Sequence, residues 1–293
     1  LLLLLLNCVC AYPLSYFELN RTHYNPMDED VLVEFPISNL ILDIESNDLE
    51  NIWITTGEGL GKASLVNFEL EFQGINSDFL PLGGNPALFV KDTIVIVSGV
   101  VSEKIGESYE PKGTGISFSI DSGESWSYMP QPVSSNNQSL YEAINWSDQE
   151  LQSLAVTTDV NNVSYDIAVK DSFIYVSSWA GGLRRVNYTS PESNWEIIPL
   201  PMDTQSDLIC NQIDEDNYYL NPRDPSDGGN HNHKGFSVLG TDDYIWVGTA
   251  YGINRGSVEP GGCINWELRA TYLAGLEGLY GDWIIGIEEQ FFY

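Results

Sequence analysis

Two histidines lie two residues apart in a polar stretch of the sequence and could take part in binding or metal chemistry. His231 and His233 follow two acids, Asp224 and Asp227. We expect the stretch to enter a β-strand, where alternate side chains share a side, so both imidazoles would point at one ligand. Imidazole and carboxylate groups bind transition metals, but a third His or Cys ligand is not evident. Metal binding, contact with an organic ligand and hydrogen bonds that only order the loop all stay open.

Two aromatic residues occupy matching turns and could stack on a ligand. Trp179 and Tyr251 each follow a short apolar strand and precede a glycine. Exposed rings there would stack on sugars, whereas buried rings would only pack loops together. The predicted ligand-binding residues are therefore His231, His233, Trp179, Tyr251, Asp227 and Asn230.

The acidic loops could bind a hard cation. Residues 214–217 and 224–228 contain clustered carboxylates, the ligand type that Ca²⁺ prefers, but neither has the spacing of a 12-residue calcium loop. Solvated acidic loops are the alternative. We predict no cofactor, with calcium kept open, and the metal-binding status is unknown.

No catalytic residue is assigned. The sequence contains no Ser-His-Asp motif, phosphate-binding loop or nucleotide fingerprint. A glycosidase needs a carboxylate pair, and nothing distinguishes one pair among 42 Asp and Glu residues.

A repeated pattern indicates the elements that must position these residues. An apolar–aromatic–apolar strand, small residues and a glycine turn recur around Trp53, Tyr175 and Trp246, with weaker copies around Val95 and Trp283. The intervals are 42, 80, 71 and 38 residues, and the short ones match a propeller blade. With an apolar strand before each copy and an aromatic strand after most, the unit has four strands. The predicted fold is an all-β propeller of antiparallel blades, incomplete, with about four and a half blades present.

One motif resembles a known family. Residues 119–126 read S-x-D-x-G-x-x-W, with Ser119, Asp121, Gly123 and Trp126 at the defining positions, and resemble the Asp-box (BNR repeat) of sialidase- and sortilin-like propellers. The repeats also resemble those of two-component-regulator-type propellers in exported bacterial proteins. The resemblance implies a structural Asp-box in a turn. The R-I-P signature of sialidases is absent, which disfavours that activity.

Three insertions are expected on one face of the propeller, where long loops often carry function: residues 100–114, 130–162 and 201–234. A short helix is predicted near residues 148–154. Cys210 and Cys263 are expected at opposite faces, so we predict that they are not bonded, because a bridge needs Cα atoms within about 7 Å.

The first residues indicate export. Residues 1–11 resemble the end of a signal peptide, with a lipidated cysteine as the alternative; residues 12–37 form an N-terminal segment, and residues 38–293 the propeller domain, truncated at its C-terminus. We expect a secreted or cell-surface protein without membrane insertion after cleavage. A missing C-terminal domain could engage secretion machinery.

The charge limits the partners. Twelve Lys and Arg residues against 42 Asp and Glu give −30, which repels nucleic acid. The predicted function is a binding module for a glycan, peptide or partner protein through the decorated face. The alternative is a propeller glycoside hydrolase or lyase.

Overall fold

The computed structural model describes most of the chain after residue 37: residues 38, 40–46, 51–66, 69–134, 140–190, 194–213, 218–272, 279 and 281–289. The expected signal remnant, the N-terminal segment and the acidic residues 214–217 lie outside this part. Within it, no helix is long and apolar enough to cross a membrane.

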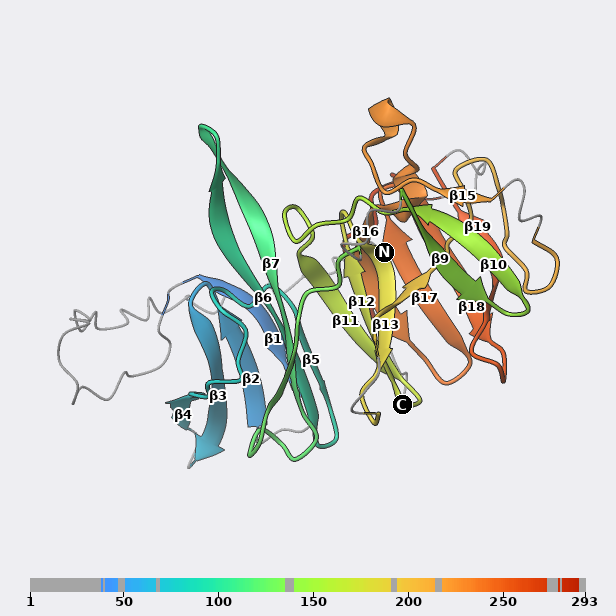
Figure 1. Cartoon of the computed structure of the whole chain (residues 1–293). Helices are drawn as coiled ribbons and strands as arrows, with labels where there is room; N and C mark the ends of the chain where they lie inside the picture. The colour runs from blue at the N-terminus through green and yellow to red at the C-terminus, as the bar shows by residue number, and fades with distance from the viewer. Residues whose placement is uncertain are drawn as a thin grey trace, which may run out of the picture. The chain divides into compact units, whose positions relative to one another are not determined.

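Four sheets each contain four antiparallel strands that pair in chain order (Figure 1). The first contains β1 (Ile41–Glu45), β2 (Asn51–Thr56), β3 (Gly59–Val66) and β4 (Glu69–Gly74). The second contains β5 (Leu88–Lys91), β6 (Ile94–Ile105), β7 (Ser108–Ser119) and β8 (Ser127–Met129). The third contains β11 (Ser164–Lys170), β12 (Phe173–Ser178), β13 (Gly182–Asn187) and β14 (Glu196–Ile198). The fourth contains β16 (Gly235–Gly240), β17 (Tyr244–Thr249), β18 (Gly252–Val258) and β19 (Ile264–Ala270).

The four sheets stack as neighbouring blades through apolar layers. The first strands of the sheets contact one another in succession, β1 with β5, β5 with β11, and β11 with β16. Successive strand residues point to opposite faces, so β12 sends Ile174 and Val176 toward the second sheet and Tyr175 toward the fourth. The predicted fold is confirmed: the described sheets are the four-stranded antiparallel blades of a β-propeller.

The fifth copy of the repeat is not a core strand. Residues 281–289 have no strand assignment, and Ile284 N–H donates to the Thr249 carbonyl (3.1 Å) as Asn85 N–H donates to that of Thr56 (3.0 Å). Asn85 leads into the first strand of the second blade. The segment after Trp283 therefore takes the place of a first strand, because it pairs with the preceding blade.

The insertions are more regular than the sequence predicts. The 100–114 insertion lengthens β6 and β7 into a hairpin that projects beyond the rest of its sheet (Figure 1). The predicted helix at 148–154 is wrong: β9 (Tyr141–Trp146) and β10 (Gln149–Leu154) form a hairpin, which β15 (Tyr219–Leu220) extends to three strands. The burial alternates along β10, with Leu151 buried between exposed Glu150 and Gln152, which is the pattern of a half-buried strand.

The prediction that the two cysteines are not bonded is also wrong. Cys210 and Cys263 form a disulfide with Cα atoms 6.3 Å apart. Leu208 pairs with Trp266 of β19, so the 201–234 insertion runs along the outer strand of the fourth blade. The insertion begins after β14 of the third blade and reaches the β18–β19 turn of the fourth blade. This path brings Cys210 and Cys263 together.

Candidate functional site

The 201–234 insertion places the two histidines in a helical turn and not in a strand. They belong to the 3₁₀ helix η2 (His231–His233), which precedes β16. His231 is exposed and its ring lies 6.1 Å from that of Tyr251, whereas His233 is 2% exposed. The expectation that both imidazoles face one ligand is therefore wrong, because residues two apart in a 3₁₀ turn do not share a side.

His233 is packed inside the protein as a neutral ring. It lies against Gly182 at the start of β13 and donates a hydrogen bond to the Ala180 carbonyl of the β12–β13 turn. Burial, together with the charges of Lys234 and Arg184, lowers its pKa to about 3. Its Nε2 atom is buried and has no hydrogen-bond partner within the described part of the chain.

Lys234 is a buried cation that the sequence did not single out. It is 2% exposed, its Nζ donates to the Pro222 carbonyl, and it lies 5.6 Å from the centre of the Trp179 ring. Burial lowers its pKa to about 8, and the carboxylate of Asp224 partly opposes that change. The lysine thus places positive charge beneath Trp179.

Asp203 and Arg269 hold η2 in place. The Asp203 carboxylate accepts backbone N–H bonds from His231 (3.0 Å) and Asn232 (2.9 Å). Arg269 donates to three carbonyls of the 202–205 segment and lies 4.4 Å from the Tyr251 ring centre. Neither residue carries a motif, so sequence reasoning missed both.

The other two predicted residues of this loop differ in burial. Asp227 is exposed in the 3₁₀ helix η1 (Pro225–Asp227), which the Asp224 side chain caps at Ser226 N–H (2.9 Å). Asn230 is buried, and its side-chain oxygen accepts the N–H of Asp203 (3.0 Å). The described residues contain no group of three or more His, Cys, Asp or Glu side chains arranged to hold a metal ion.

Four aromatic residues from separate elements form one cluster, which we call the aromatic surface: Tyr165, Trp179, Phe236 and Trp283. Trp179 in the β12–β13 turn lies 5.4 Å from Phe236 of β16 and 5.9 Å from Trp283, measured between ring centres. Phe236 lies 5.4 Å from Trp283 and 6.3 Å from Tyr165 of β11. Trp283 is 63% exposed and Tyr165 38%, so the cluster presents aromatic area to solvent.

Of these four, only Trp179 was predicted from the sequence. Tyr165 lies on the first strand of the third blade and Phe236 on that of the fourth, and Trp283 lies in the segment after the fourth blade. The stacking of blades brings them together, and no spacing in the sequence reports it.

The Asp-box-like turn lies between β7 and β8. Asp121 accepts the Ser119 hydroxyl (2.6 Å) and the Ser125 N–H (2.9 Å), and these bonds lower its pKa to about 2. Gly123 has φ of +87°, and Trp126 donates its ring N–H to the Gly123 carbonyl (3.1 Å). Strands alternate in direction, so this turn and the β12–β13 turn emerge at opposite ends of their blades. The turn is thus a local hydrogen-bonded structure away from the aromatic surface.

Carboxylates on the first strands link successive blades. Asp43 accepts Leu88 N–H of the second blade (3.0 Å), and Asp166 accepts Val238 N–H of the fourth (2.8 Å). Burial raises the pKa of Asp166 to about 7, although its hydrogen bonds from backbone N–H groups oppose the rise. Burial also raises the pKa of Glu45 to about 7, and the neighbouring acids Asp43 and Glu288 add to that rise. The sequence held no signal for this set, because acids are common along the chain.

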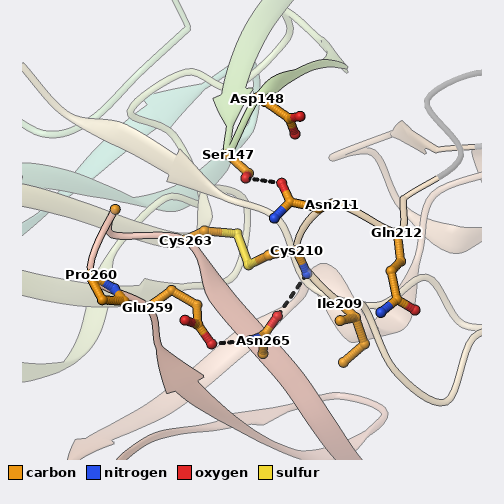
Figure 2. A pocket seen from close by; sticks show the side chains of 11 residues that line it. Ser147, Asp148, Ile209, Cys210, Asn211, Gln212, Glu259, Pro260, Cys263 and Asn265 are labelled. Atoms are coloured by element: carbon orange, nitrogen blue, oxygen red, sulfur yellow. Dashed lines mark hydrogen bonds between the residues drawn. A yellow bond between two sulfur atoms is a disulfide. The ribbon is translucent and has the colours of Figure 1, made fainter.

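Two cavities flank the inserted three-stranded sheet. One, of about 660 Å³, contains the disulfide (Figure 2). There Cys210 N–H donates to the Asn265 side-chain oxygen (2.8 Å), and Ser147 of the β9–β10 turn donates to Asn211. The other, of about 720 Å³, lies between β9 and the outer strands of the third blade, and it shares Ser147, Gly261 and Cys263 with the first.

Comparisons with known proteins give distant matches only. No family model matches the sequence, and no curated protein matches it. A structural genomics protein of unknown function from Bacteroides thetaiotaomicron matches at 8% identity and a TM-score of 0.36, over 78% of this chain and 43% of that one. The Neurospora crassa Pan2 WD40 domain matches at 16% identity and a TM-score of 0.36, over 80% of this chain and 53% of that one. YCF48 bound to D1 peptide matches at 13% identity and a TM-score of 0.34, over 86% of this chain and 72% of that one.

The chain thus spans about half the length of the first two of these structures. At such TM-scores the matches carry no argument about function, and the assignment of the fold rests on the strand pairing and the stacking of the blades.

Proposed function

We propose that the chain is the binding module of an exported β-propeller protein and that the aromatic surface binds a peptide or a partner protein. The observation that carries the proposal is the contiguous set of Tyr165, Trp179, Phe236 and Trp283 with substantial exposed area. Exposed aromatic clusters are typical of interaction sites, because rings bury large areas at low entropic cost. Lys234 beneath Trp179 adds a positive charge close to the rings, which favours an acidic ligand.

The resemblance to Asp-box and two-component-regulator-type propellers, and the leucine-rich start of the sequence, support an exported protein. The 201–234 insertion also supports binding at this end of the blades, since Lys234 at its end lies 5.6 Å from the centre of the Trp179 ring. A glycan remains the other ligand class for the same rings.

Selection of peptides from a displayed library, in parallel with a glycan array, tests this proposal. We expect Trp283→Ala to weaken the selected ligands about tenfold or more, while the melting temperature stays unchanged, because Trp283 is largely exposed. Tyr109→Ala is the matched control, since Tyr109 is 69% exposed on the projecting hairpin. Equal binding by wild type and Trp283→Ala would contradict the proposal.

The alternative is a glycoside hydrolase, and the carboxyl groups of the first strands favour it. Glu45, with a pKa near 7 beside Asp43, has the protonation that a general acid needs at neutral pH. Release of reducing sugar from a panel of polysaccharides tests it. Activity that Glu45→Gln abolishes would support the hydrolase, whereas no release by the wild type would remove it.

A further inference from the structure

The cavity of about 720 Å³ between the inserted sheet and the third blade is separate from the aromatic surface. We call it the inserted-sheet cleft. It is lined by β9 on one side and by β13 and β14 on the other, with residues 130–133 at one border. Its volume lies within the range of small-ligand sites, about 300–1,000 Å³.

The charged groups of the inserted-sheet cleft are already neutralised in pairs. Arg185 donates to Glu196 (2.8 Å), and Arg184 lies 3.9 Å from Glu142. Arg184 is 3% exposed, and burial lowers its pKa to about 10, so it remains protonated at neutral pH. A cleft with matched cations and carboxylates favours neither an anion nor a cation, and it offers a neutral ligand both donors and acceptors.

Aromatic and amide groups complete the lining. Trp195 is half-buried, and its ring N–H donates to the Pro130 carbonyl (2.9 Å), which fixes the ring at the cleft. Asn145 and Asn194 are exposed and add amide donors and acceptors. Trp146 also lines the cleft, and its ring N–H is buried without a hydrogen-bond partner among the described residues.

We propose that the inserted-sheet cleft binds a neutral oligosaccharide. A sugar ring presents an apolar face, which suits a fixed tryptophan, and a rim of hydroxyls that both donate and accept hydrogen bonds. Paired Arg and Glu side chains and amides supply both kinds of group without net charge. The site does not depend on the aromatic surface, so it stands or falls independently of the proposed function.

Calorimetric titration with six neutral hexasaccharides tests the proposal: cello-, laminari-, manno-, xylo-, malto- and chitohexaose, with trigalacturonate as the acidic comparison. We expect at least one neutral ligand to bind the wild type more tightly than trigalacturonate. Trp195→Ala should weaken binding of that neutral ligand about tenfold or more. Ala143→Trp should do the same without removing a contact, because Ala143 is exposed on β9 and lines the cleft.

Tyr109→Ala is the matched control, since it removes an exposed aromatic ring from the projecting β6–β7 hairpin, outside both sites, and should leave hexasaccharide binding unchanged. Melting curves show whether each variant is folded. If Trp195→Ala is not folded, Ala143→Trp still tests the proposal. Absence of binding to all six neutral ligands overturns the proposal. So does tighter binding of trigalacturonate, or binding that the folded Ala143→Trp variant retains in full.

Discussion

At the scale of single residues, the Asp-box-like turn depends on a glycine that no other residue can replace without cost. Gly123 has φ of +87°, and a Cβ there would lie 2.6 Å from the Trp53 ring of the first blade. Trp53 and Trp126 in turn meet edge to face, with ring centres 6.5 Å apart. The turn therefore joins two blades.

We expect Gly123→Ala to lower the free energy of unfolding by about 2–4 kcal/mol, since it combines backbone strain with a steric clash. Gly106→Ala is the matched control, because Gly106 has φ of +63° and nothing within 4 Å of its Cβ position. That change should cost only about 1–2 kcal/mol of strain. Urea denaturation measures both, and equal losses would show that the contact with Trp53 contributes nothing.

The carboxyl of Asp166 should make stability depend on pH. Its pKa is about 7 in the folded protein against 3.8 in the unfolded chain, so its contribution is fully present below about pH 4 and is lost as the pH rises through about 7. Burial is the main cause, and the nearby acids Asp43 and Glu288 reinforce it, while N–H bonds from Val238 and Ile167 oppose it.

We therefore expect the melting temperature of Asp166→Asn to fall less than that of the wild type between pH 5 and pH 8. Asparagine does not titrate, and it keeps an acceptor oxygen for only one of the two N–H groups, which Asp166 accepts on separate oxygens, so the variant should be less stable overall but less dependent on pH. Asp171→Asn, on the exposed β11–β12 turn, serves as the control and should keep the wild-type slope. Identical slopes for wild type and Asp166→Asn would show that this carboxyl is ionised in the folded protein across the range.

At the scale of elements, the disulfide anchors the 201–234 insertion to the fourth blade. It joins residues 53 apart and supplements the pairing of Leu208 with Trp266. Closing a loop of this length restricts the unfolded chain and contributes about 2–4 kcal/mol.

Cys210→Ser and Cys263→Ser should each lower the free energy of unfolding by that amount, and the double variant should lose no more than either single one. Chemical denaturation with and without reductant measures it, and the reductant should affect only the wild type. Free thiols found by alkylation and mass spectrometry in the folded, oxidised protein would contradict the bond.

The strands of the blades could be predicted because their chemistry is local. The core strands around Trp53, Tyr175 and Trp246 alternate between two buried faces and end at glycine turns, and all three appear as β2, β12 and β17. The predictions from the sequence failed where contact with a distant part of the chain decides the local structure. The 148–154 segment is a strand because β9 pairs with it, and the cysteines meet because the insertion follows β19.

The candidate site was less predictable for the same reason. Trp179 and Tyr251 could be placed by the turn pattern alone. His233, however, is buried against Gly182 of a different blade, and Lys234 is buried below Trp179. Contacts between blades leave no periodic trace in the sequence, so the sequence indicated the end of the blades that carries the site but not its members.

At the scale of the whole molecule, charge opposes the packing of blades. The chain carries 42 acidic against 12 basic side chains, and a net charge of −30 favours expansion through mutual repulsion. Some of the basic residues are buried or paired, such as Lys112, which contacts both Glu103 (2.6 Å) and Asp159 (3.0 Å). Because acidic side chains greatly outnumber basic ones, added salt should stabilise the fold more by screening repulsion between acids than it destabilises the fold by screening such ion pairs.

We expect the melting temperature to rise as NaCl increases from about 20 to 500 mM at constant pH, because the screening length falls from tens of Å to a few Å over that range. Differential scanning fluorimetry measures it. CaCl₂ and MgCl₂ at matched ionic strength separate screening from binding. Equal shifts would assign the effect to screening, whereas a larger shift with CaCl₂ would indicate a specific calcium site. A melting temperature that falls with NaCl would contradict the prediction and show that attractive ion pairs dominate.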